Sequence, residues 1–263
     1  GGKYQLIFDK SQGMNNFHSR EFEVQTESGF VKKIKLGEFS EIVINTSSKY
    51  ANQAPVADWM RDDWGAFHGW GTINLDMPQT KFKINLTDGR SGDNALKFVG
   101  WQNSFKAAEI GITTDATNAA AIRSPFGSDN LTVEASVLTI NTKGETNAYG
   151  IKIAPGKRSP NVADRPRADR YLKFDSTEIT MERGGVGVYV GFDDKETKTD
   201  AYNNPINYNY TQEQIPTDEK EKAEFYKDRM FYLVTAELGN TTIELKGDPQ
   251  NSDHGNVGLF SAG

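Results

Sequence analysis

The feature that most constrains the fold is a succession of three short strand patterns, at residues 171–176, 177–182 and 186–191. Each pattern alternates apolar residues with polar or small ones, and this period of two is typical of a β-strand with one buried face. Tight bends join the segments, at Asp175-Ser176 and at residues 183–185. Strands joined by such short bends favour one coil of a solenoid, in which each strand pairs with its counterpart in the next coil.

The same triplet recurs along the chain, as a solenoid requires. Its strands are expected at residues 131–135, 137–141 and 148–153, at 231–238, 242–246 and 257–262, at 72–77, 82–86 and 95–100, and in a partial copy at 30–36 and 41–45. Self-similar segments whose insertions fall mostly at one joint are typical of repeat architectures. We therefore predict an all-β fold, a right-handed parallel β-helix of about five coils. A β-sandwich is the alternative.

Nothing in the sequence resembles a linker between two domains. We expect residues 1–29 to form N-terminal strands or a cap, and residues 30–263 to form the β-helix. Long insertions are expected at about 47–71, 102–130, 155–170 and 192–230. Within them, Asp115 is expected to cap a short helix, and Thr217 a longer one.

The composition argues against several classes of function. The net charge is -6 and the pI is near 5.2, which disfavours a nucleic-acid-binding protein because such proteins need clustered Lys and Arg. No apolar run approaches the ~20 residues that cross a bilayer, so we expect no membrane insertion by this segment. The chain has no cysteine, which excludes disulfides and thiolate chemistry. We expect a monomer without a cofactor or a metal ion.

Two stretches near the C-terminus resemble a known family. Residues 240–247 (NTTIELKG) with 255–263 (GNVGLFSAG), and the similar run GVGVYV at 185–190, look like the passenger repeats of type V (classical) autotransporter adhesins, especially the large fusobacterial ones. The resemblance covers the repeat strands from about residue 30 to the end. It implies a right-handed β-helix on the bacterial cell surface, in extracellular space, anchored through an outer-membrane barrel not present in this chain. The chain would then be a fragment of a longer passenger.

The first insertion holds the strongest binding candidates, because a solenoid core is a scaffold whose loops are free to vary. Aromatic rings stack on the apolar face of a sugar while carboxylates accept hydrogen bonds from its hydroxyl groups, so this composition favours a glycan or peptide surface. Alternatively, the tryptophans cover the open N-terminal end of the β-helix. The candidates are Trp59, Trp64, Trp70, His68, Asp62 and Asp63.

Two other insertions carry recognition candidates. Tyr202, Tyr208 and Tyr210 lie in the fourth insertion, and tyrosine is a residue that enriches binding loops. The third insertion contains a basic cluster that suits sialic acid, a sulfated glycan or an acidic protein patch, although such a cluster is more often a solvated loop. Its members are Lys157, Arg158, Arg165, Arg167 and Arg170.

The sequence contains no nucleophile elbow, no HExxH and no P-loop, so we assign no catalytic residue. We predict a binding protein and not an enzyme: a cell-surface adhesin segment whose loops bind a host or bacterial surface glycan or protein receptor. Two alternatives stay open. One is a polysaccharide-cleaving β-helix enzyme, which needs acids and basic residues along a groove. The other is a structural stalk that holds a distal tip away from the membrane.

Overall fold

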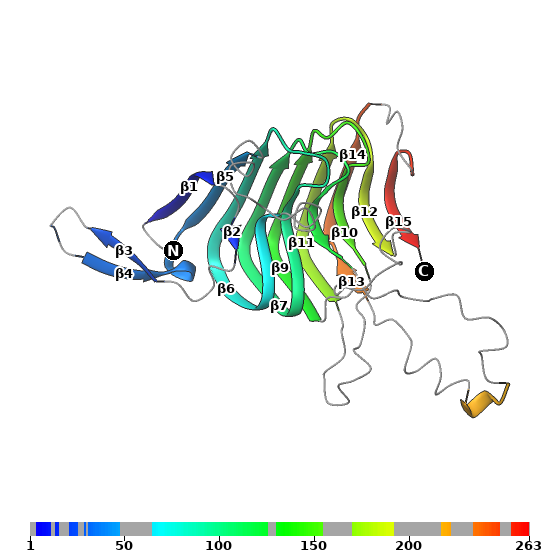
Figure 1. Ribbon diagram of the computed structural model, residues 1–263, viewed down its shortest axis with the longest axis horizontal. Coiled ribbons are helices and arrows are strands. Elements are labelled where there is room, and N and C mark those ends of the chain that lie inside the picture. The colour runs from blue at the N-terminus through cyan, green and yellow to red at the C-terminus, as the bar shows by residue number, and fades with distance from the viewer. Residues whose placement is uncertain are drawn as a thin grey trace.

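The computed structural model describes residues 4–11, 14–15, 21–25, 29, 31–47, 65–125, 130–154, 170–191, 217–221, 234–247 and 254–262. These residues are nearly all β-strand, with a short helical segment at 219–221 (Figure 1). The elements are β1 (Gln5–Ser11), β2 (Met14–Asn15), β3 (Glu21–Gln25), β4 (Val31–Lys35), the 3-10 turn η1 (Leu36–Glu38), β5 (Glu41–Ser47), β6 (Gly65–Thr87), β7 (Asn94–Thr114), β8 (Ala120–Ser124), β9 (Asn130–Thr142), β10 (Tyr149–Ile153), β11 (Arg170–Met181), β12 (Val186–Gly191), β13 (Val234–Glu237), β14 (Asn240–Leu245) and β15 (Val257–Ala262). Within the described part of the chain, no helix has the length and apolar character needed to cross a membrane.

Most strands belong to one 13-stranded sheet whose pairs are all parallel, and they stack in three rows. The first row runs from β2 through residues 65–70 of β6 and 94–99 of β7 to β8, β10, β12 and β15. The second row holds the middle of β6 and β7, the first halves of β9 and β11, and β13. The third row holds β1, β5, the last parts of β6, β7, β9 and β11, and β14.

The path of the chain explains the three rows. β6 passes through all of them in sequence, with breaks in register near Trp70 and Met77, and β7 repeats the same path beside it. Each strand therefore pairs with the strand that follows one circuit later along the chain. This arrangement is compatible with a parallel β-helix. It differs from the β-sandwich alternative, whose sheets are antiparallel.

The expected insertion at 102–130 is wrong, because strands occupy most of it. Residues 102–114 are the second part of β7, and β8 follows at Ala120–Ser124. The expected short helix is wrong as well, since the Asp115 carboxylate accepts hydrogen bonds from the backbone N–H groups of Asp88 (2.8 Å) and Gly89 (2.7 Å) in the preceding turn. Residues 102–124 therefore make one complete circuit through the three rows. The alternation of apolar and polar residues does not predict it, because the polar Asn103 occupies a buried position.

Two further expectations need correction. The segment 30–36 does not stack on the other strands as a partial coil, because β4 pairs antiparallel with β3 in a separate two-stranded sheet, which projects at the left of Figure 1.

The helical segment at 219–221 is capped by Asp218 and not by Thr217, since the backbone N–H groups of Lys220 and Glu221 both donate to Asp218 Oδ1 at 3.0 Å. The expected apolar side of that helix lies outside the described residues.

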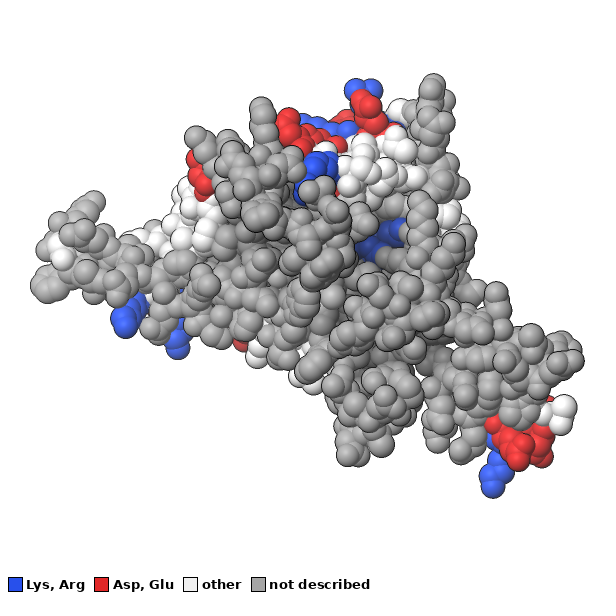
Figure 2. Space-filling model, viewed as in Figure 1, with Lys and Arg blue, Asp and Glu red and all other residues white. Residues whose placement is uncertain are grey.

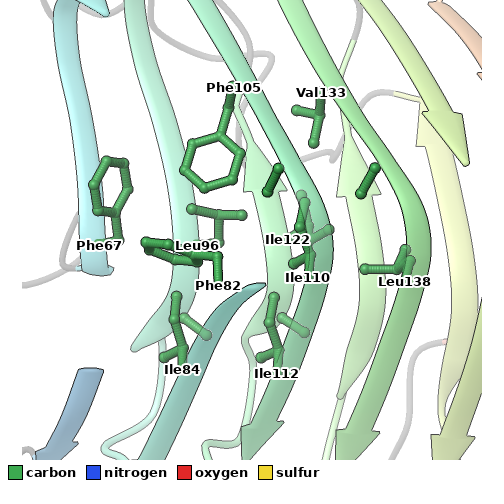
Figure 3. Close-up of a cluster of buried hydrophobic side chains, with 14 of the residues drawn as sticks. Phe67, Phe82, Ile84, Leu96, Phe105, Ile110, Ile112, Ile122, Val133 and Leu138 are labelled. Carbon is green, nitrogen blue, oxygen red and sulfur yellow. The ribbon is translucent and has the colours of Figure 1, made fainter. Parts of the chain in front are cut away.

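Columns of apolar side chains between the rows form the core. Phe67, Phe82, Phe98 and Phe105 contact one another edge to face, with ring centroids 4.9 to 6.5 Å apart, and Figure 3 shows three of these rings together with Leu96. In the third row, isoleucines stack at one register position through successive strands: Ile44, Ile84, Ile112, Ile140, Ile179 and Ile243. Burying one such side chain contributes about 1.5–3 kcal/mol, so the columns hold neighbouring strands in register.

Candidate functional site

Outward-facing charges in the second row alternate in sign from strand to strand. Asp76, Lys106, Glu134, Lys173 and Glu237 occupy one register position in successive strands. The Nζ of Lys106 lies 3.3 Å from Glu134 Oε2. Opposite charges on neighbouring strands contribute roughly 0.2–1 kcal/mol per pair, so this row stabilises the strand register and suggests no other role.

In the third row, too, charged side chains pair with opposite charges on neighbouring strands. Lys83 Nζ lies 2.9 Å from Glu41 Oε2, and Lys81 Nζ lies 3.0 Å from Glu109 Oε1, each pair joining neighbouring strands. Like charges directly opposite each other destabilise a sheet. Because positive and negative side chains alternate on the second and third rows, a row with basic side chains and no acidic one is unusual.

The first row carries such a set of side chains. One register position holds four basic side chains in succession and then two aromatic ones, and no acidic residue occupies it in the described strands. After Asn15 of β2, the residues in order along the stack are His68, Lys97, Arg123, Lys152, Tyr189 and Phe260. We call the first four the basic row. They come from four different strands, so their alignment results from the register of the sheet.

The basic row is held in place by specific contacts. Lys97, Arg123 and Lys152 are 2%, 7% and 8% exposed. The Lys152 ammonium lies 4.4 Å from the Tyr149 ring centroid and 5.3 Å from that of Tyr189, which is cation–π geometry. Arg123 Nη1 donates to the backbone carbonyl of Lys152 at 3.2 Å. These three side chains are therefore buried and ordered by contacts within the molecule.

A second arginine adds positive charge at the end of β8. Arg170, which is fully buried, donates from Nη1 to the hydroxyl of Ser124 (2.7 Å) and to its carbonyl (3.3 Å). Arg123 Nη1 donates to that same carbonyl at 3.1 Å. Two guanidinium groups therefore converge on one acceptor, which concentrates positive charge where the first row meets the second.

Aromatic side chains gather at the C-terminal end of the first row. Tyr189 and Phe260 are stacked, with ring centroids 5.0 Å apart and planes 13° apart. His254 lies 4.7 Å from Phe260 and 5.3 Å from Tyr189, and Tyr149 meets Tyr189 edge to face at 5.7 Å. We call Tyr149, Tyr189, His254 and Phe260 the aromatic end. Tyr149 and Tyr189 are buried, whereas His254 and Phe260 are partly exposed. The aromatic end therefore has some ring surface at which another molecule can pack.

Figure 2 shows described basic side chains in the middle of one face of the molecule, set back among the surrounding residues, where β10 and β12 lie in Figure 1. Within the described residues, no group of three or more His, Cys, Asp or Glu is placed to hold a metal ion. Among the side chains of the aromatic end, His254 and Phe260 keep partly exposed ring surface.

The structure describes few of the residues predicted from the sequence. His68 lies in the basic row, and Trp70 belongs to the backbone of β6, paired with Val99. The expected loop at 47–71 therefore ends before residue 65, and these two residues are in a strand. Arg170, expected in a loop, begins β11. The other candidates, Trp59, Trp64, Asp62, Asp63, Tyr202, Tyr208 and Tyr210, lie outside the described residues.

The chain order nevertheless relates those candidates to the first row. Residues 48–64, with Trp59 and Trp64, lead into the first-row part of β6. Residues 155–169 and 192–233 follow β10 and β12 and precede the second row. Every one of these connections thus begins or ends at a first-row strand, which is also where the basic row lies.

Sequence reasoning missed Lys97, Arg123 and Lys152, although a signal for them exists. Each follows an apolar residue at the same place in its strand, as Leu96-Lys97, Ile122-Arg123 and Ile151-Lys152. Aligning the first-row strands by that pair would have placed the three cations in one row. The expected insertion at 102–130 hides this alignment, because it includes residues 120–124.

Comparison of the chain with protein-family models, with curated proteins and with solved structures found no match.

Proposed function

We propose that this chain is a ligand-binding segment of a cell-surface adhesin, folded as a right-handed parallel β-helix. It binds a host or bacterial surface ligand, a glycan or a protein receptor, on the first-row side. One observation carries the proposal: the connections that hold the predicted Trp and Tyr candidates all adjoin first-row strands, where the partly exposed rings of His254 and Phe260 also lie.

The fold part of the proposal is supported by the three rows of parallel pairs, because one circuit after another adds a strand to each row. Right-handedness follows the strong general preference of parallel crossovers. A location on the bacterial surface, anchored by a barrel elsewhere in a longer protein, is supported by the resemblance of residues 240–247 and 255–263 to autotransporter passenger repeats.

A test is binding of the purified chain to an array of glycans and of surface proteins, beside a variant with Trp59, Trp64, Tyr202 and Tyr208 changed to alanine. We expect the chain to bind and the variant to lose most of the signal, with the same circular dichroism spectrum. Absence of any ligand would contradict the proposal and favour the stalk. Shortening of a bound polysaccharide would favour the enzyme.

A further inference from the structure

We infer that the ligand is an extended segment of a partner protein, which adds a strand to the edge of β15 (Val257–Ala262) in the first row. This inference rests on the proposed binding function and adds the chemical class of the ligand, a peptide and not a glycan. Its basis is that, among the described residues, nothing pairs with one edge of β15 and a side chain at a core position there is exposed.

Leu259 occupies a core position of the first row but is largely exposed. It continues the register column of Leu96, Ile122, Ile151 and Val188. Those four side chains are at most 3% exposed, whereas Leu259 is 65% exposed. The strands of the four have a neighbour on both sides, and β15 has one on one side only in the described part of the chain. An apolar side chain on one further strand would bury Leu259 and stabilise the complex.

The backbone of β15 also favours a peptide. β15 pairs in parallel with β12, and no described strand pairs with its other edge. An unpaired edge presents a row of N–H and C=O groups, to which an extended peptide can add by β-augmentation. A sugar ring can pack on one aromatic face, but it matches neither the row of backbone groups nor the apolar column. A peptide strand matches both.

The side chains of β15 determine the pattern that the added strand needs. Successive side chains of a strand point to opposite faces, so Leu259 lies in the core column and Phe260 faces outward, where its partly exposed ring stacks on Tyr189. Alternate side chains give β-augmentation its specificity. We therefore expect an apolar residue opposite Leu259 and an aromatic one opposite Phe260, as β12 has Val188 and Tyr189.

The charges at this end of the stack favour a partner segment with basic residues. Strands β13, β14 and β15 contain two charged residues, Glu237 and Glu244, and both are exposed acids. The alternation of sign in the second row ends at Glu237, which has Lys173 on one side and no described strand on the other. A basic residue in the partner segment would continue that alternation.

The experiment measures binding of the full chain to a synthetic peptide with the sequence of residues 185–191, GVGVYVG, and one lysine added at each end. Residues 186–191 already pair with β15 along its other edge, so the peptide has the required alternation. Fluorescence anisotropy of the labelled peptide gives the affinity. We expect binding about tenfold or more tighter than that of the same residues in scrambled order. Glutamates in place of the lysines should weaken it.

Hydrogen exchange followed by mass spectrometry locates the bound peptide. We expect the peptide to slow exchange in β15, because an added strand engages backbone N–H groups there. Strand β1 is the control, since it also pairs on one side only within the described residues, and its exchange should not change.

The central variant is Leu259→Asp, with Ile7→Asp of β1 as its matched control. Each change places a carboxylate at an exposed apolar position, because Leu259 is 65% and Ile7 is 55% exposed. Leu259→Asp should lower the affinity about tenfold or more, since binding would bury the charge beside the apolar column. Ile7→Asp should stay within about twofold. If Leu259→Asp does not fold, Leu259→Ala tests the same contact, with a loss of about threefold or more.

Several outcomes would overturn the inference. Binding of a glycan but of no peptide would assign the ligand to the other class and leave the proposed function intact. Binding of no ligand of any class would overturn both. Equal binding of the scrambled peptide would show that strand alternation plays no part. Slow exchange in β15 without any peptide would show that its edge is already covered, by a second copy if the protection depends on protein concentration and by another segment of this chain if it does not.

Discussion

Asn103 is a polar side chain at a core position. It is 4% exposed, and its register partners in the second row are the fully buried Ile73 and Leu131. Neither Nδ2 nor Oδ1 has a hydrogen-bond partner in the described part of the molecule. A buried polar group without a partner costs about 1–3 kcal/mol.

We therefore expect Asn103→Leu to raise the free energy of unfolding by about 1–3 kcal/mol, because it replaces the amide with an apolar group of similar size. Urea denaturation measures the change. Asn74→Leu is the control, since Asn74 is exposed in the same row, and its effect should stay within about 0.5 kcal/mol. A less stable Asn103→Leu variant would mean that the amide makes a hydrogen bond through a buried water molecule.

Tyr171 is a residue whose ionisation is changed by the fold. Burial raises the pKa of its phenol above the ordinary value of 10.0, and its hydrogen bond to Glu237, together with the negative charges of Glu237 and Glu134, raises it further. The folded state therefore favours the neutral phenol. The stability that this group contributes is fully present below pH 10 and is lost as the pH rises through the raised pKa.

We expect Glu237→Gln to lower the pKa of Tyr171 toward 10, because it removes the nearer of the two negative charges. The measurement is an ultraviolet titration of phenolate, with the Tyr171→Phe variant subtracted to isolate one tyrosine among ten. The difference between the unchanged protein and Tyr171→Phe gives the titration curve of Tyr171 alone. A midpoint of that curve at or below pH 10 would show that the carboxylates do not raise the pKa of the phenol.

Small residues decide how closely the first-row strands approach the third row. A Cβ on Gly150 of β10 would lie 2.5 Å from the carbonyl oxygen of Gly187 and 2.9 Å from Ile179 Cγ2. A Cβ on Gly187 of β12 would meet the Gly258 carbonyl at 2.7 Å and Ile243 Cγ2 at 2.6 Å. Glycine thus lets isoleucines of the third row pack directly against the backbone of the first.

Gly150→Ala should lower the free energy of unfolding by about 1–3 kcal/mol, the usual cost of overpacking, because the contact with a backbone oxygen cannot be relieved by a rotamer change. Gly258→Ala is the matched control in β15, since nothing lies within 4 Å of the added Cβ. Its effect should stay below about 0.5 kcal/mol. Equal effects of the two changes, measured by urea denaturation, would contradict this packing account.

At the level of elements, the sequence predicted the positions of most strands but missed others. Period-two alternation predicted the positions of β9 to β12, β14 and β15, because the pattern depends on neighbouring residues within one strand. It missed the circuit formed by residues 102–124, where the polar Asn103 occupies a buried position and weakens the apolar signal. It also placed 30–36 in the stack, because alternation does not distinguish a parallel from an antiparallel partner.

At the scale of the whole molecule, the described parallel strands stack one after another in three rows, so stability should vary along the stack. The middle strands have partners on both sides, and Ile110, Ile112 and Ile140 are at most 2% exposed. In the described part of the chain, β13, β14 and β15 each pair on one side, and Leu259 is 65% exposed. In repeat proteins each unit is stabilised mainly by its neighbours, so the end of the stack should open most easily.

We expect hydrogen exchange, followed by mass spectrometry, to be slowest in residues 109–114 and 137–142 and faster in β14 and β15, because terminal strands open locally at a lower free energy. The measurement should be repeated at several protein concentrations. Equal protection of β14 and the middle strands at the lowest concentration would contradict a gradient of stability along the stack.

The sequence by itself determined that the chain forms β-strands, which faces of them are buried, and that the strands recur, since each of these follows from local alternation and short bends. It also indicated Arg170 as one of a basic group and His68 as a binding candidate. Only the tertiary structure decided that His68, Lys97, Arg123 and Lys152 form one row. Their alignment depends on the register between strands far apart in the chain, and that register is set by apolar columns and turn lengths that no single segment contains.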